Sequence, residues 1–239
     1  MFFDLQTLVN LIFSFIDFSG FTLLSLAIYR IPITLYWKRL LVIQLMFIVV
    51  MIIHNNILMN KDFYSLSIVG TAIILSTFLL RVPFLYSSLI WGTGYLLYVA
   101  IQGIILFLIN WTGIVEMQEL LNQPIYVKAM TMTTFLVNML IYYIIERKRL
   151  GFMFIMNRFR LQKRNIQAKD IFIATLLVCT VSLGQLGLVS LSSNNMNQYL
   201  LTILLSIIVI SLIGLYITYK FNMKEIDERF NSLRGKNNR

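Results

Sequence analysis

The polar side chains that suggest chemistry in this chain stand singly inside long apolar runs. Asp17 is the clearest case, because it lies in the middle of the run FSFIDFSGF. An ionisable side chain at the centre of a bilayer costs at least about 2.5–3.5 kcal/mol and almost always faces other protein groups. We therefore expect Asp17 to face the interior of a helix bundle. Its candidate partners are His54, Asn55, Asn56, Gln102 and Gln185.

A second polar group has helical spacing. Tyr95, Tyr98 and Gln102 recur at i, i+3 and i+7, which places two hydroxyls and an amide on one helical face. Facing inward, they would line a polar cavity in the outer half of a bundle. The structural alternative is a set of hydrogen bonds that join neighbouring helices. The candidate ligand-binding residues are Asp17, His54, Tyr95, Tyr98, Gln102 and Gln185.

Catalytic chemistry finds little support in the residue types present. The single cysteine, Cys179, excludes an internal disulfide and a cysteine-rich metal site. His54 is the only histidine, and we expect it towards the outer side, away from Cys179 in the inner half. HExxH, Walker A and paired acidic motifs are absent from the sequence. We expect no enzyme activity, no metal and no cofactor.

Composition places these side chains in a membrane. Hydrophobic residues make up 59% of the 239 residues and charged residues only 13%, against roughly 25% charged in soluble domains. The mean hydropathy is +0.80. The net charge of +10 does not indicate nucleic-acid binding, because the Lys and Arg residues flank apolar runs, where they orient spans and contact anionic lipid.

Seven apolar runs are long enough, at about 20 residues, to cross a bilayer as helices. We predict an all-α, polytopic bundle over residues 1–219 and a cytoplasmic helical tail over 220–239. Pro83 predicts a tight turn between the third and fourth runs. The N-terminus lacks the basic region of a cleaved signal peptide, so we expect the first run to remain. The runs are 5–29, 40–59, 63–80, 85–110, 126–145, 171–191 and 199–219.

The distribution of basic residues predicts the orientation. The loop 146–170 holds eight of the 20 Lys and Arg residues, and such loops stay on the cytoplasmic side. This places the N-terminus outside and the C-terminus inside, with Lys61 and Lys128 as the only basic residues outside. We expect the outer segment 111–125 to form a short amphipathic helix, as a connector or as a lid over a ligand. The three tryptophans predict an aromatic belt near span ends: Trp37, Trp91 and Trp111.

The tail carries an apolar seam. Apolar residues step by four and three along it, as in a coiled coil, until Gly235 ends the helix. We predict that this seam contacts a second copy of the chain or a separate signalling protein. Two heptads are few, and the alternative is a single helix lying on the inner lipid surface. The seam consists of Met223, Ile226, Phe230 and Leu233.

Seven spans, an outer N-terminus, a basic last inner loop and a helix leaving the last span resemble the sensor region of accessory-gene-regulator-type receptor histidine kinases, which detect peptide pheromones. The segment LLRVPFLYSSLIWGTGYLLYVAIQGIILFL, residues 79–108, is similar to the middle spans of that region. The resemblance implies an extracellular peptide ligand and a multi-pass protein of the bacterial cytoplasmic membrane. No phosphoacceptor helix or ATP-binding domain follows Arg239, so we expect signalling through another chain.

Two hypotheses of function follow. The first is a sensory or regulatory membrane module that recognises an extracellular peptide or amphipathic ligand and signals through its last span and tail. The second is a substrate-binding membrane subunit of a transporter. Matching halves with Gly- or Pro-broken spans, which mark many transporters, are not evident in the sequence. The heptad seam of the tail favours the sensor.

Overall fold

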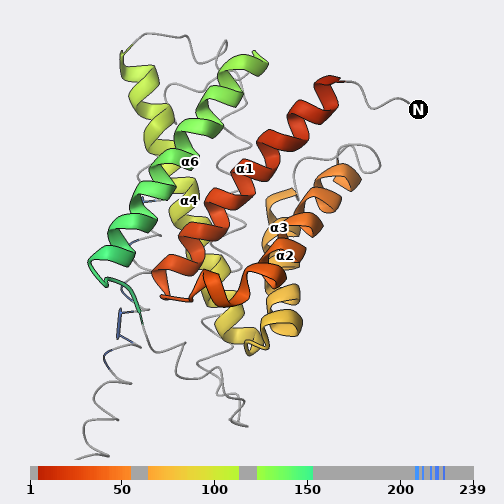
Figure 1. Cartoon of the computed structure of the whole chain (residues 1–239). Coiled ribbons are helices and arrows are strands. Elements are labelled where there is room, and N and C mark those ends of the chain that lie inside the picture. Colours follow the sequence, from red (N-terminus) through yellow and green to blue (C-terminus); the bar gives the residue numbers. More distant parts are fainter. Residues whose placement is uncertain are drawn as a thin grey trace, which may run out of the picture.

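The computed structural model describes residues 5–54, 64–112 and 123–152, together with seven single positions between 208 and 223. Every regular element in these ranges is helical, so the all-α prediction is confirmed for the described part. The described ranges form six helical elements, whose arrangement Figure 1 shows. They are α1 (Leu5–Ile28), α2 (Ile33–Ile53), α3 (Tyr64–Leu75), the π-helical turn η2 (Ser76–Leu80), α4 (Phe84–Thr112) and α6 (Pro124–Arg147).

Four of these helices, α1, α2, α4 and α6, are long and apolar enough to cross a membrane, which indicates a multi-pass membrane protein. α3 and η2 form a shorter apolar helix, Tyr64–Leu80, where the sequence predicts the third span. α2 begins at Ile33 and not at residue 40, because the helix starts directly after Pro32 and includes the polar turn before the apolar run. The predicted span 171–191 and the segment 113–122 lie outside the described residues, and of the predicted span 199–219 only single helical positions are described.

An arginine in the left-handed backbone region stands one or two residues past the end of each of three helices, α1, η2 and α6. Arg30 has a φ of 52°, Arg81 of 57° and Arg149 of 51°. Left-handed backbone costs a non-glycine residue about 1–2 kcal/mol, and here it stops each helix abruptly. After Arg81 the chain turns through Pro83 into α4, as the sequence predicts. Gly151, with a φ of 108°, then lets the backbone N–H of Phe152 donate a 2.7 Å hydrogen bond to the Ile28 carbonyl.

α1 is the central helix, and it contacts α2, α4 and α6 (Figure 1). Aromatic rings fill the space between α1, α2 and α4. The Phe21 ring centre lies 5.3 Å from Trp91 and 5.8 Å from Tyr98, and Phe18 meets Phe47 at 5.3 Å. Such ring pairs add about 0.5–1.5 kcal/mol each beyond the area that they bury.

The aromatic-belt prediction is wrong for one tryptophan. Trp91 is fully buried, and its Nε1 donates a 2.6 Å hydrogen bond to Ser76 Oγ. A buried indole needs such a partner, and Ser76 supplies it at the start of η2. Trp37 and Trp111 are exposed, as a belt requires. Trp91 thus belongs to the core and ties α4 to the end of α3.

α6 is polar on its buried side and apolar on its exposed side. Leu136, Met139 and Leu140 are 52–60% exposed, whereas Thr134 and Asn138 are completely buried. A helix with this pattern suits lipid on its outer face and polar contacts within the bundle. The polar face of α6 lies against α1, where the candidate site is found.

Candidate functional site: the α1–α6 cleft

Asp17 is tied to α4 by a chain of two hydrogen bonds. Gln102 Nε2 donates to the Tyr98 hydroxyl at 2.8 Å, and the Tyr98 hydroxyl donates to Asp17 Oδ1. Tyr98 and Gln102 lie one helical turn apart on α4, so the same face of that helix points at the middle of α1. In each bond the acceptor is the group nearer to Asp17, so the Asp17 carboxyl group is the last acceptor in the chain.

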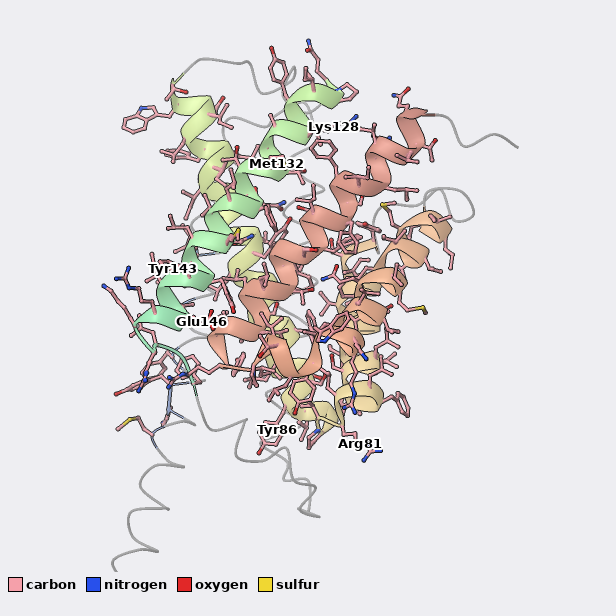
Figure 2. All side chains as sticks on the ribbon, in the orientation of Figure 1. Arg81, Tyr86, Lys128, Met132, Tyr143 and Glu146 are labelled. Atoms are coloured by element: carbon pink, nitrogen blue, oxygen red, sulfur yellow. The ribbon has the colours of Figure 1, made fainter. Side chains whose placement is uncertain are left out.

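A cavity of about 330 Å³ opens on the other side of Asp17, between α1 and α6. We call it the α1–α6 cleft. Figure 2 shows Lys128 near the beginning of α6, at the opposite end of this helix from Glu146. The residues that line the cleft are Asn10, Phe13, Ser14, Asp17, Pro124, Val127, Lys128 and Thr131.

The cleft carries opposite charges at two levels. Lys128 Nζ lies 5.8 Å from the centre of the Phe13 ring, in a cation–π contact. Asp17 follows Phe13 by four residues, or about 6 Å along α1. Within the described ranges, no ion pair joins Lys128 to Asp17 or either of them to another residue. Both charges are therefore available to a bound molecule.

Beyond Asp17, α6 presents polar atoms that lack partners. Thr134 Oγ1 and both side-chain polar atoms of Asn138 are buried, and none of the residues described here hydrogen-bonds to them. α1 comes close at this level through Gly20, where a Cβ atom would lie 3.4 Å from Asn138 Nδ2. Buried polar groups in proteins nearly always have a hydrogen-bond partner, so we expect a ligand, an ion or water to contact these atoms.

The other predicted site residues lie apart from the cleft. His54 Nε2 is 2.9 Å from Ser67 Oγ, and its ring meets Tyr64 edge-on at 5.6 Å, so it joins α2 to α3. Tyr95 is buried, and its hydroxyl faces Ser65 outside hydrogen-bonding geometry. Gln185 lies outside the described ranges.

The structure thus divides the predicted set. Asp17 lines the cleft, whereas Tyr98 and Gln102 lie on α4, on the side of Asp17 that faces away from the cleft. Tyr98 is the partner of Asp17, although the sequence did not single it out for that role. The cleft residues that the sequence analysis missed are Asn10, Ser14, Lys128 and Thr131. The signal that could have found them is the helical spacing of polar residues at 10, 14 and 17 and again at 128, 131, 134 and 138.

The side chains of the cleft could bind a polar or charged molecule. They offer a carboxylate, an ammonium group, hydroxyls and amides, which suit a ligand with charged or hydrogen-bonding ends. Among the residues that the structure describes, no group of three His, Cys, Asp or Glu side chains stands together, so a multi-carboxylate metal centre finds no support there.

Comparisons with protein-family models, with curated proteins and with solved structures find no match to this chain.

Proposed function

We propose that this chain is a non-enzymatic sensory or regulatory module of the bacterial cytoplasmic membrane, and that it recognises an extracellular peptide or other amphipathic ligand. The observation that supports this most is the α1–α6 cleft, which reaches from the first turn of α6 to Asp17 in mid-helix. From there the Tyr98–Gln102 hydrogen bonds lead into α4. A ligand in the cleft would contact α1 and α6 directly and would act on α4 through these hydrogen bonds.

The proposed topology has seven spans, with the N-terminus outside and the C-terminus inside. Lys128 then lies at the outer end of α6, and the cleft opens outward. Figure 2 places Arg81 and Glu146 towards the end of the bundle opposite Lys128. The arginines that follow α1, η2 and α6 would lie at the inner surface, where basic residues are favoured.

The last span and the tail would carry the output to a second copy or to a separate signalling protein. Met223, the first seam residue, is helical and 39% exposed. Leu212, Tyr216 and Tyr219, which precede it at the same four-three spacing, are helical and more than half exposed. The other seam residues, Ile226, Phe230 and Leu233, lie outside the described positions. Their place in the seam therefore follows from the four-three spacing of the sequence.

Disulfide crosslinking in membranes tests the link between site and output. Cysteines at Ile226 and at Lys224 are compared in a Cys179→Ser background, and each is combined with Asp17→Asn. The proposal expects crosslinking at Ile226 but not at Lys224, and a changed crosslinking rate at Ile226 when Asp17 is replaced. Equal crosslinking at both positions, or an unchanged rate with Asp17→Asn, would contradict a signalling role.

A substrate-binding subunit of a transporter is the alternative. The observation that favours it is the continuation of polar side chains past Asp17, through Thr134 to Asn138 on α6, because a permeation path would need such groups. Exchange of the tail for an unrelated helix separates the two hypotheses. A transport subunit would keep ligand binding and transport, whereas a sensor would keep binding and lose its output.

A further inference from the structure

We propose that the space just beyond the inner end of the α1–α6 cleft is a binding site for a small monovalent cation of the sodium type, held by oxygen atoms of Asp17, Thr134 and Asn138. The proposal goes beyond a sensory role, and it shares with that role only the cleft. Three features support it: the carboxyl group of Asp17, the buried oxygens of Thr134 and Asn138 on α6, and the register of α1 and α6.

Asp17 behaves as an acceptor that needs a positive partner. The Tyr98 oxygen already accepts from Gln102, so its own proton is directed at Asp17. An ionised carboxylate inside a membrane calls for a counter-charge. Within the described part of the chain no cation pairs with Asp17, and Lys128 Nζ lies further out, over the Phe13 ring.

Two oxygens on α6 are placed to share such a cation. Thr134 Oγ1 and Asn138 Oδ1 are completely buried, and within the described ranges they have no hydrogen-bond partner. A buried polar atom left without a partner carries a free-energy cost. A cation that both oxygens coordinate would remove that cost. Asn138 Nδ2 would remain to donate to water that enters from the cleft.

The register of the helices places these atoms against the turn of α1 that follows Asp17. Asp17 and Thr131 line the same cleft, and Gly20, one turn beyond Asp17 on α1, lies against Asn138, two turns beyond Thr131 on α6. Thr134 lies between Thr131 and Asn138 on the same face of α6. The turn of α1 from Asp17 to Gly20 therefore faces the turn of α6 that carries Thr134. The absence of a side chain at Gly20 permits this approach.

The donor set defines the class of cation. Hard cations prefer oxygen ligands, and one carboxylate with two neutral oxygens balances a single positive charge. Calcium sites usually gather several carboxylates, and magnesium is bound through carboxylates and water in octahedral geometry. The cleft supplies both a route for a hydrated ion and room for the waters that complete its shell. A monovalent ion is therefore the better match.

The experiment measures thermal unfolding of the purified full chain in detergent at pH 8. Sodium chloride replaces choline chloride stepwise at constant ionic strength. A cation that binds the folded state raises the unfolding midpoint with the logarithm of its concentration. We expect this rise with sodium, a smaller one with potassium and none with choline.

Two variants and a matched control assign the response to this site. Thr134→Val removes only the hydroxyl and should weaken the apparent sodium affinity at least about tenfold, since a lost contact to a charged group is worth about 1.5–3 kcal/mol. Thr133→Val is the control, because Thr133 is exposed and its hydroxyl donates to the Ala129 carbonyl. Asp17→Asn should abolish the response altogether.

Equal midpoints in sodium and choline would overturn the proposal. So would a midpoint that follows pH but not sodium, since Asp17 would then take up a proton. A sodium response that survives in Thr134→Val would place the ion elsewhere and contradict this site. None of these outcomes bears on crosslinking of the tail, so the cation site and the signalling role are tested separately.

Discussion

The Tyr98 hydroxyl of α4 donates a hydrogen bond to the carboxylate of Asp17 on α1. This bond joins the aromatic interior of the bundle to the polar cleft on the other side of α1. Tyr98 is buried against Phe21, and its oxygen accepts from Gln102, so it is held from two directions. Asp17 therefore has a fixed position in mid-helix, with one oxygen committed to α4.

Tyr98→Phe should destabilise the protein by about 1–3 kcal/mol, because it leaves the Asp17 carboxylate and the Gln102 amide without their shared partner. The ring and its packing remain. Tyr95→Phe is the matched control, since the buried Tyr95 hydroxyl has no hydrogen-bond partner among the described residues. That change should leave the unfolding midpoint unchanged or raise it. Thermal unfolding in detergent measures both, and equal losses in the two variants would refute the importance of the bond.

Gly94→Ala should disrupt the contact between α1 and α4. An added Cβ would lie 2.0 Å from Ser25 Oγ and 2.8 Å from Ser25 Cα, so the backbones would have to separate. Overpacking of this kind costs about 1–3 kcal/mol or more.

Gly70→Ala is the control for Gly94, because nothing lies within 4 Å of a Cβ at Gly70. Alanine there should stabilise α3 by up to about 1 kcal/mol through helix propensity. The two variants are compared by their unfolding midpoints. A neutral Gly94→Ala would mean that α1 and α4 do not pack as closely as described.

The proposed orientation predicts opposite accessibility for two exposed residues. Gln123 precedes α6 at the Lys128 end, and Arg81 follows η2 at the other. In a Cys179→Ser background, a cysteine at Gln123 should react with a membrane-impermeant maleimide added to intact cells. A cysteine at Arg81 should react only after the membrane is opened. The reverse pattern would invert the topology and turn the cleft towards the cytoplasm.

The sequence could predict the helical class and most helix limits, because long apolar runs with few charges have one stable form in lipid. It could also place Asp17, Tyr98 and Gln102 in the middle or outer half of the bilayer. It could not show that Tyr98 lies between the other two, since periodicity fixes the face of each helix and not which helices are neighbours. Trp91 illustrates the same limit: its distance from the span end suggests an interface, but its burial follows from the partner at Ser76.

The sequence did not predict the cleft, for a related reason. Lys128 and Thr131 stand near the start of an apolar run and look like ordinary end residues of a span. Their role emerges only when α6 packs against α1 and its buried face proves polar. Apolar exposure carries no penalty in lipid, so hydropathy alone does not show which side of such a helix is inside.

Accessibility of the cleft from outside tests the account most directly. Ser14 lines the cleft, whereas Ser19 lies away from it on the same helix. Single cysteines at these positions, in a Cys179→Ser background, are treated on intact cells with membrane-impermeant thiosulfonates of either charge. We predict that a cysteine at Ser14 reacts and that one at Ser19 does not. No reaction at Ser14, or equal reaction at both positions, would contradict an outward-open cleft that leads to Asp17.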